Sequence, residues 1–215
     1  MKRLISQLAI AFSVVSLLAL LLLHFLSADI HPIWHMVSEY AFGPYNRLLS
    51  VFFFAWALAY VATGIALWEW AESTPSKIAV ILIFVSAVGA FMGGLFDVRH
   101  PLHGAAFGLG IPFLPIAALI ISRHLRKRHS IDSSTLRLLA HGTWMSVVLM
   151  GLAMALFISG MQNAGGFAST PELLTSLPDN VIALHGIPNR ILVVVYIAWL
   201  IMVNKKLSSG SDIHT

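Results

Sequence analysis

The stretch IAVILIFVSAVGAFMGGLF (residues 78–96), with DVRHPLHG (residues 97–104) directly after it, decides how this chain folds. Its first part carries no charge over about the 20 residues that an α-helix needs to cross a bilayer core. Its second part gathers an acid, an arginine and two histidines, and another long apolar run follows. The stretch therefore predicts two membrane-spanning helices joined by a short polar connection.

The composition of the whole chain agrees with a membrane protein. Hydrophobic residues make up 58% of the 215 residues, charged residues make up 10%, and the mean hydropathy is +0.85. Such a chain has more apolar surface than a small soluble core can bury, which excludes an ordinary soluble globular protein. Cysteine is absent, which excludes disulfides and thiolate metal ligands. The length suits a single domain over residues 1–215.

Further apolar runs complete the predicted set of spans. The first run is longer than the ~7–15 apolar residues of a signal peptide, so we expect it to be a retained helix. The last run reaches spanning length if residues 187–190 form its first turn. We therefore predict an all-α polytopic membrane protein with six transmembrane helices in three hairpins. Besides residues 78–96, the runs are approximately residues 4–26, 48–68, 104–122, 138–159 and 191–203.

Lysine and arginine fall mainly on one side of the predicted spans. Of the 13 such residues, only Arg47, Arg99 and Arg190 lie in the connections on the other side. An excess of positive charge marks the cytoplasmic side, so we expect both termini in the cytoplasm and the chain in the cytoplasmic membrane. The basic run at residues 123–129 then lies beside anionic headgroups. We therefore expect membrane lipids as partners and no nucleic acid, and the sequence leaves the oligomeric state open.

The connections on the outer side carry the residues that are capable of chemistry. The centres of the spans contain no Asp, Glu, Lys or Arg, which argues against an ion-coupled pump. The longest outer connection, residues 160–190, contains Thr170-Pro171-Glu172, which predicts the start of a short helix. This connection either covers an outer site or is a loose loop. The outer polar residues are His31, His35, Ser38, Glu39, Asp97, Arg99, His100, His103, Asp179, His185, Asn189 and Arg190.

The motif Asp-x4-Leu-His-Gly occurs twice, at residues 97–104 and at residues 179–186. A carboxylate close to an imidazole can fix its tautomer and raise its basicity, which suits a general base or the support of a metal ligand. Each copy precedes a helix that runs in the same direction, as in the parallel repeats of some transporters. We expect His103 and His185 to share one outer cavity, with Asp97 beside His103. The alternative is that both copies only cap helix ends.

Residues 30–41 predict a short helix at the outer membrane interface. Apolar residues recur there at helical spacing, and His31, His35 and Ser38 then share another face. Two histidines four residues apart on one helix face can bind one metal ion, as in zinc motifs. The alternative is an interfacial helix whose histidines face water.

With these motifs, the chain resembles a bacterial membrane family catalogued as domain of unknown function 998. The resemblance covers most of the chain. It rests on the six spans, the segment His35-Met36-Val37-Ser38, the Asp–His connection before the fourth span, and His185 with Asn189-Arg190 before the last span. It implies a fold and a membrane location and no assigned chemistry.

A fainter similarity connects the chain to the alkaline-ceramidase-like membrane hydrolases, which use Ser, Asp and three His around zinc. The similarity implies that Ser38, Asp97, His103 and His185 supply such a set. The chain departs from that family in having six spans instead of seven and a His-x3-His pair after the first span instead of in the last. The reactive face is also the outer one.

Three groups of candidate site residues follow from the motifs and the resemblance. The candidate catalytic residues are Asp97, Ser38, Glu39 and Asp179. The candidate ligands of a metal, possible zinc, are His103, His185, His31 and His35. The candidate substrate-binding residues are Arg190, Asn189, Arg99 and His100.

The sequence leaves three functions open. The first is a metal-dependent hydrolase in which zinc activates water against a lipid or lipid-linked substrate. The second is a non-enzymatic protein that binds or transports a lipid headgroup or a small solute. The third is an outer-face b-type haem protein in which His103 and His185 are the axial ligands.

Overall fold

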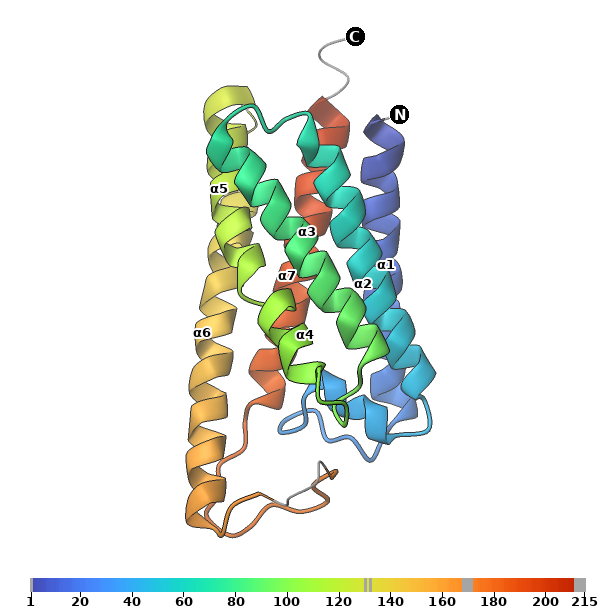
Figure 1. The fold of residues 1–215 in the computed structure, drawn as a ribbon, viewed down its shortest axis with the longest axis vertical. Coiled ribbons are helices and arrows are strands. Elements are labelled where there is room, and N and C mark those ends of the chain that lie inside the picture. Colours follow the sequence, from blue (N-terminus) through green and yellow to red (C-terminus); the bar gives the residue numbers. More distant parts are fainter. Residues whose placement is uncertain (1, 130, 132, 168–171, 211–215) are drawn as a thin grey trace.

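The computed structural model describes residues 2–129, 131, 133–167 and 172–210, and these residues form helices and connections with no strand among them. Several long helices lie side by side along the long axis of the molecule, and both termini lie at the same end (Figure 1). The elements are α1 (Lys2–Leu26), the 3₁₀-helix η1 (Val37–Phe42), α2 (Asn46–Trp68), α3 (Thr74–Leu95), α4 (His103–Gly110), α5 (Phe113–His129), α6 (Ser134–Asn163) and α7 (Gly186–Gly210).

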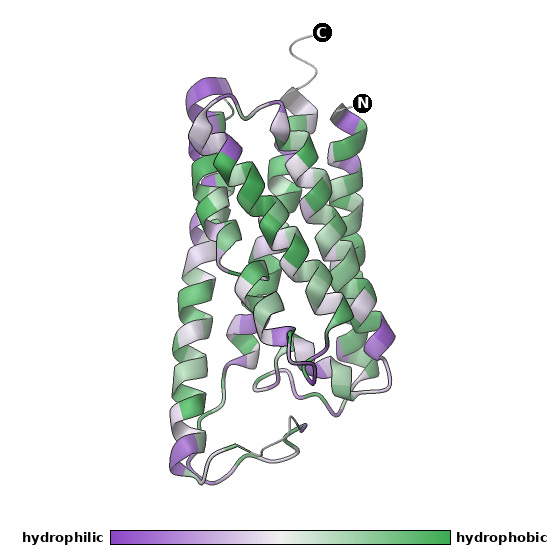
Figure 2. Ribbon diagram, in the orientation of Figure 1, coloured by the Kyte–Doolittle hydropathy of each residue, from purple (hydrophilic) through white to green (hydrophobic). Residues whose placement is uncertain are grey.

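Six helical segments in the described part of the chain are long and apolar enough to cross a membrane, which confirms the predicted all-α fold. Apolar residues occupy the middle of each helix, and polar residues gather at the two ends of the bundle (Figure 2). The last helix begins at Gly186, so residues 187–190 do form its first turn. The spans are Arg3–Leu26, Asn46–Trp68, Thr74–Leu95, His103–His129, Ser134–Asn163 and Gly186–Ser209.

The fourth span consists of two helices, α4 and α5, separated at Ile111 and Pro112. Proline lacks the N–H of a helical hydrogen bond and its ring clashes with the preceding turn, which explains the break. A backbone carbonyl that is freed inside a membrane needs another donor. The hydroxyl of Tyr196 on α7 donates to the Ile111 carbonyl at 2.8 Å. This hydrogen bond from α7 stabilises the break, so α4 does not continue in the direction of α5.

Helix α4 packs directly on the backbone of α3. A Cβ atom added to Gly89 would lie 2.1 Å from the backbone nitrogen of Gly110. Only a glycine allows this approach, as expected for small residues at membrane helix interfaces. The close contact fixes the end of α4, at Leu109 and Gly110, relative to α3.

Helix α7 lies inside the bundle and supplies several of its most buried side chains, including Tyr196, Trp199 and Leu200. Polar groups of α7 have partners on other helices: the Asn204 amide donates to Thr63 at 2.7 Å, and the Trp199 indole donates to Ser122 at 3.2 Å. Such pairing is needed because a polar group without a partner is costly in a membrane. Helix α7 therefore holds the bundle together.

The helix predicted over residues 30–41 is wrong in its first half, because residues 31–36 form turns and only η1 is helical. The N–H of His31 donates to Nδ1 of His35 at 2.8 Å, which closes a tight turn around Pro32. Met36 is extended, with ψ of 162°, and its N–H donates to the Glu39 carboxylate. These side chains compete with the helical hydrogen bonds.

Candidate functional site

A cavity of about 590 Å³ opens at the end of the bundle opposite the termini, and we call it the distal cavity. The 34–42 segment, the start of α4, the end of α6 and the connection before α7 surround it. Apolar side chains such as Phe157 and Met161 form much of its wall. Its polar and ionisable lining residues are Ser38, Glu39, His103, Glu172, Thr175, Ser176 and His185.

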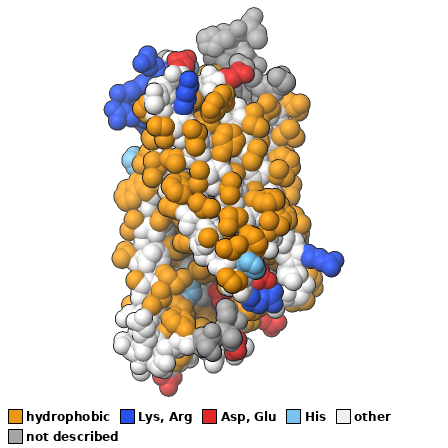
Figure 3. All heavy atoms as spheres, viewed as in Figure 1, with side chains coloured by type: hydrophobic (Ala, Val, Ile, Leu, Met, Phe, Trp, Pro, Cys, Tyr) orange, Lys and Arg blue, Asp and Glu red, His pale blue; other side chains and the backbone are white. Residues whose placement is uncertain are grey.

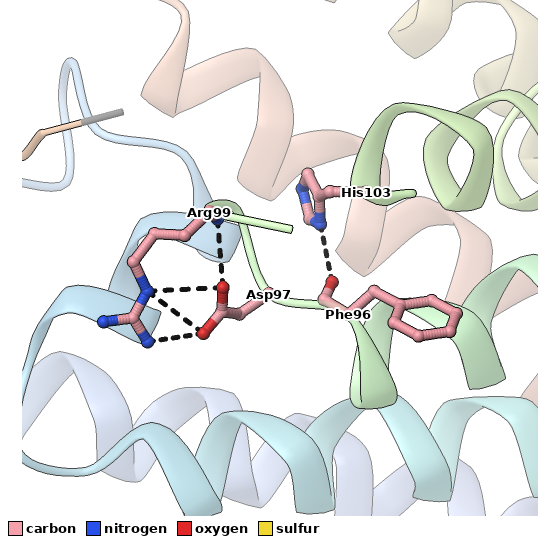
Figure 4. Close-up of polar contacts among 4 residues, drawn as sticks. All are labelled: Phe96, Asp97, Arg99 and His103. Carbon is pink, nitrogen blue, oxygen red and sulfur yellow. Dashed lines mark hydrogen bonds and ion pairs between the residues drawn. The ribbon is translucent and has the colours of Figure 1, made fainter. Parts of the chain in front are cut away.

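His103 is held at the start of α4 by a backbone carbonyl. Its Nδ1 lies 2.9 Å from the carbonyl oxygen of Phe96, and its ring turns toward that carbonyl (Figure 4). A carbonyl only accepts, so Nδ1 carries the proton and the neutral ring keeps Nε2 as an acceptor. The sequence predicted that the Asp97 carboxylate fixes the tautomer of His103, but the Phe96 carbonyl does so. A carbonyl orients the ring as well as a carboxylate does, but it adds no charge.

Asp97 pairs with Arg99 instead of with His103 (Figure 4). Its carboxylate accepts hydrogen bonds from the Arg99 backbone and guanidinium, and this pairing lowers the pKa of Asp97. The two side chains are 37% and 49% exposed and neither lines the distal cavity. His100 is also exposed and stacks on Phe96, with a ring distance of 4.5 Å. These three residues form a rim beside the cavity.

His185 lies directly before α7 and is buried in the wall of the distal cavity, with 3% of its surface exposed. Its ring lies 4.2 Å from the ring of Phe157. Nδ1 is buried and has no hydrogen-bond partner within the described ranges. Burial, together with the nearby His35 and Arg190, lowers the pKa of His185 to about 4. His185 is therefore a neutral imidazole at physiological pH, with unused hydrogen-bonding capacity.

His35 uses both of its ring nitrogens within the protein. Nδ1 accepts from the His31 backbone, so Nε2 carries the proton and donates to the Leu174 carbonyl at 3.0 Å. The ring also stacks on Trp34 at 4.0 Å, and burial lowers the pKa of His35. His35 therefore ties the 31–36 turns to the 172–176 segment that lines the cavity, and His31 remains exposed beside it.

The arrangement of the candidate ligands does not fit a zinc ion. The described residues contain no group of three or more His, Asp or Glu close enough to hold a metal. His35 has no free nitrogen, which leaves His103 and His185 as the imidazoles with open positions on the cavity. A catalytic zinc site needs three protein ligands, and zinc has no part in the function proposed below.

Glu39 is the acid that the structure places in the cavity. It belongs to η1, and its carboxylate accepts from the Met36 N–H. Burial raises the pKa of Glu39 to about 7, against the opposing effects of that hydrogen bond and of Arg190. Ser38 precedes it and also lines the cavity. A carboxyl group that titrates near neutral pH can donate or accept a proton there.

Arg190 binds protein groups and does not line the distal cavity. It donates to Nε2 of His24 at 2.7 Å, to the carbonyls of His35 and Gly186 at 2.6 and 3.0 Å, and to the hydroxyl of Tyr40 at 3.2 Å. Its partners are all neutral, and no carboxylate in the described part of the chain is within ion-pair distance. The predicted substrate-binding residue is thus a cross-link between α1, the 35–40 segment and α7.

A second cavity, of about 60 Å³, lies between α2, α3, α4 and α7, and we call it the bundle cavity. Met36, Ser38 and His103 line both cavities, so the two are neighbours. Trp56 and Tyr60 also line the bundle cavity, and their buried indole N–H and phenol oxygen meet the hydrogen-bond criteria with no other group in the described part of the chain. Unsatisfied polar groups beside an open volume indicate that a water molecule or a ligand group binds there.

The family model described as Protein of unknown function (DUF998) matches residues 10–204, which extends from the first turns of α1 to the last turns of α7. The chain belongs to this family. No curated protein and no solved structure matches this DUF998 protein. The similarity to the alkaline-ceramidase-like hydrolases therefore finds no support in these comparisons.

The candidate residues of this DUF998 protein fall into three groups. Ser38, Glu39, His103 and His185 line the distal cavity, so the histidines of the two motif copies do share one cavity, although Asp97 is not beside His103. His35, Asn189 and Arg190 bind protein groups, and Asn189 accepts from the Val37 N–H at 2.9 Å. Outside the cavity lie His31, Asp97, Arg99, His100 and Asp179.

Several lining residues escaped the sequence analysis. Trp56 and Tyr60 are four residues apart in an apolar run and look like ordinary core aromatics. His24, which lines neither cavity but binds Arg190, was missed as well because it has no motif around it. Glu172 lines the distal cavity, but the helix start predicted at Thr170-Pro171-Glu172 lies outside the described residues in its first two positions. The available signal was weak: a His or an aromatic hydroxyl within a predicted span is a candidate for a buried polar contact.

Proposed function

We propose that this protein binds an amphiphilic lipid or lipid-linked molecule, with the polar group in the distal cavity and the apolar part toward the bundle cavity. The observation that carries the proposal is the shared wall of the two cavities, formed by Met36, Ser38 and His103. A cavity with polar groups at the end of the bundle thus borders an apolar one inside the span. This order of polar and apolar surroundings matches the order of the parts of a lipid.

The lining of the distal cavity favours a neutral or cationic polar group. Its ionisable residues are two carboxyl groups and two imidazoles, and no Lys or Arg of the described residues lines it. The Arg190 guanidinium is used by His24, Tyr40 and backbone carbonyls. Hydroxyl or amine groups suit the acceptor Nε2 of His103, the Ser38 hydroxyl and Glu39. A strongly anionic headgroup would meet carboxyl groups without a compensating cation.

Hydrolysis of the bound lipid is a second candidate function, and the pKa of about 7 at Glu39 favours it. A general acid or base is most effective when its pKa lies near the working pH. Glu39 and Ser38 are adjacent on η1 and line the same cavity as His103 and His185. Binding is the broader proposal, because the same residues hold the headgroup whether or not a bond is broken.

The test compares lipid retained by purified wild-type protein with lipid retained by His103→Ala and by His100→Ala, using native mass spectrometry. Each variant removes one imidazole, and the two positions are three residues apart, but only His103 lines the cavities. Loss of one hydrogen bond to the ligand should weaken binding by roughly 2- to 13-fold in His103→Ala. His100→Ala should bind like the wild type.

Equal binding by the two variants, or protein without bound lipid in every preparation, would contradict the proposal. The same samples distinguish the other interpretations. Stoichiometric zinc that is lost in His103→Ala would favour the metal-dependent hydrolase, and a haem absorption band would favour the b-type haem protein. Release of a cleaved lipid product by wild type but not by Glu39→Gln would support hydrolysis.

A further inference from the structure

A groove of about 650 Å³ lies between α5 and α6 at the end of the bundle that holds both termini, and we call it the basic groove. Lys and Arg side chains gather at this end of the molecule (Figure 3). The groove is far from the distal cavity, which lies at the opposite end. Its lining residues are Leu119, Ser122, Arg123, Arg126, Lys127, Arg137, Ala140 and His141.

The cations of the groove lie on two helix faces that oppose each other. The α5 positions 119, 122, 123, 126 and 127 follow the spacing of one helix face, and so do positions 137, 140 and 141 of α6. Two packed membrane helices normally present apolar or small residues to each other. Here Arg123, Arg126 and Lys127 lie across the groove from Arg137.

The three cations of α5 have no counter-ion among the described residues. The lining contains no Asp or Glu among the described residues, and the side chains of Arg123, Arg126 and Lys127 make no hydrogen bond or ion pair with any residue of the described ranges. Like charges at helical spacing repel each other. A bound anion removes this repulsion and occupies the donors.

The groove also offers a neutral donor and an apolar floor. The Trp144 indole donates to Nδ1 of His141 at 3.2 Å, so a neutral His141 carries its proton on Nε2 and can donate it to an anion. Trp144 is 42% exposed, as is common for tryptophan at a membrane interface. Leu119 lines the groove one turn farther into the apolar part of α5.

We infer that the basic groove binds the phosphate group of an anionic phospholipid from the membrane leaflet on the side of the termini. Three arginines and a lysine surround the phosphodiester, since guanidinium groups match phosphate oxygens bidentately. The acyl chains continue from the groove over Leu119 into the hydrocarbon region. Basic pockets between transmembrane helices bind anionic headgroups in this way.

The experiment measures binding of short-chain phosphatidylglycerol, short-chain phosphatidylcholine and inorganic phosphate to the full chain in neutral detergent. Arg126→Gln and Lys127→Gln each remove a charge that lines the groove. Arg128→Gln is the matched control, because Arg128 is exposed on the same helix end and does not line the groove. We expect binding of phosphatidylglycerol to weaken about 10-fold in each groove variant and less than about 2-fold in the control.

Three results would overturn the inference. An equal loss in Arg128→Gln would mean that net charge alone attracts the lipid. Phosphatidylcholine has the same phosphate beside a choline cation, so equal binding of this lipid would mean that the net negative charge of the headgroup has no role. Inorganic phosphate that binds as tightly as phosphatidylglycerol would assign the groove to a soluble anion and remove the lipid from the proposal.

Discussion

Replacing Arg190 by alanine should lower stability far more than it lowers ligand binding. The substitution leaves Nε2 of His24 and the carbonyl of His35 without a donor, whereas the Gly186 carbonyl keeps the backbone N–H of residue 190 in the first turn of α7. Each buried acceptor without a partner costs about 1–3 kcal/mol. Because Arg190 is only half-buried, water reaches part of this region, and we expect a total loss of about 3–5 kcal/mol.

The assay is thermal unfolding of the purified chain in detergent, followed by intrinsic fluorescence. A loss of this size lowers the melting temperature by roughly 6–20 °C for a chain of about 200 residues. Arg99→Ala is the matched control: its ion pair with Asp97 is exposed, and exposed pairs contribute about 0–1 kcal/mol. Arg190→Lys should recover little, because lysine has no planar fork of donors.

A different pattern would refute the cross-link. If Arg190→Ala melts like the wild type but no longer binds lipid, the guanidinium serves the ligand, as the sequence suggested. If Arg99→Ala loses as much stability as Arg190→Ala, the buried hydrogen bonds of Arg190 contribute no more to stability than the exposed ion pair of Arg99.

Three further predictions follow from the topology, the buried acid and the helix contact. A reporter fused after Lys206 should be active only in the cytoplasm and one inserted at Gly165 only outside; the reverse would overturn the charge argument. Burial raises the pKa of Glu39 to about 7. The stability that this shift contributes is complete below the ordinary value of 4.5 and is lost as the pH rises to 7, so the melting temperature of the wild type relative to Glu39→Gln should fall across this window and then stay level. A pH-independent difference would contradict the burial of Glu39. Gly89→Ala should cost about 1–3 kcal/mol because its Cβ would meet the α4 backbone at 2.1 Å, whereas Gly108→Ala, with nothing within 4 Å, should melt normally; equal melting would contradict the packing.

The fold could be predicted from sequence because hydropathy and helix breakers act locally. A run of about 20 uncharged residues has one stable arrangement in a bilayer, which places each span without knowledge of its neighbours. Pro112 likewise marks a distortion of the fourth span, although only the structure shows that α4 and α5 are separate helices. The turns at residues 31–36 were missed because the His35 side chain competes there with helical hydrogen bonds.

The site could be predicted only in part, because spacing along the chain does not give the direction of a side chain. Asp97 has the spacing of a partner for His103, but Arg99 is two residues away and binds the carboxylate at the surface. The backbone carbonyl of Phe96 then orients the imidazole, and any residue type supplies a carbonyl. The second copy of the motif also does not pair its acid with its histidine in the cavity, since Asp179 is exposed and does not line the cavity of His185.

Histidines of similar burial in this protein differ in what they can bind, and hydrogen bonds decide the difference. His35 is 1% exposed and His185 is 3% exposed, and both lie at the distal end of the bundle. Both nitrogens of His35 are engaged, one by an N–H and the other by a carbonyl, so a ligand gains nothing from it. Nδ1 of His185 is buried and has no partner among the residues that the structure describes, which costs folding free energy unless a ligand or water supplies one. The imidazole that weakens the empty protein is therefore the one that a bound headgroup stabilises.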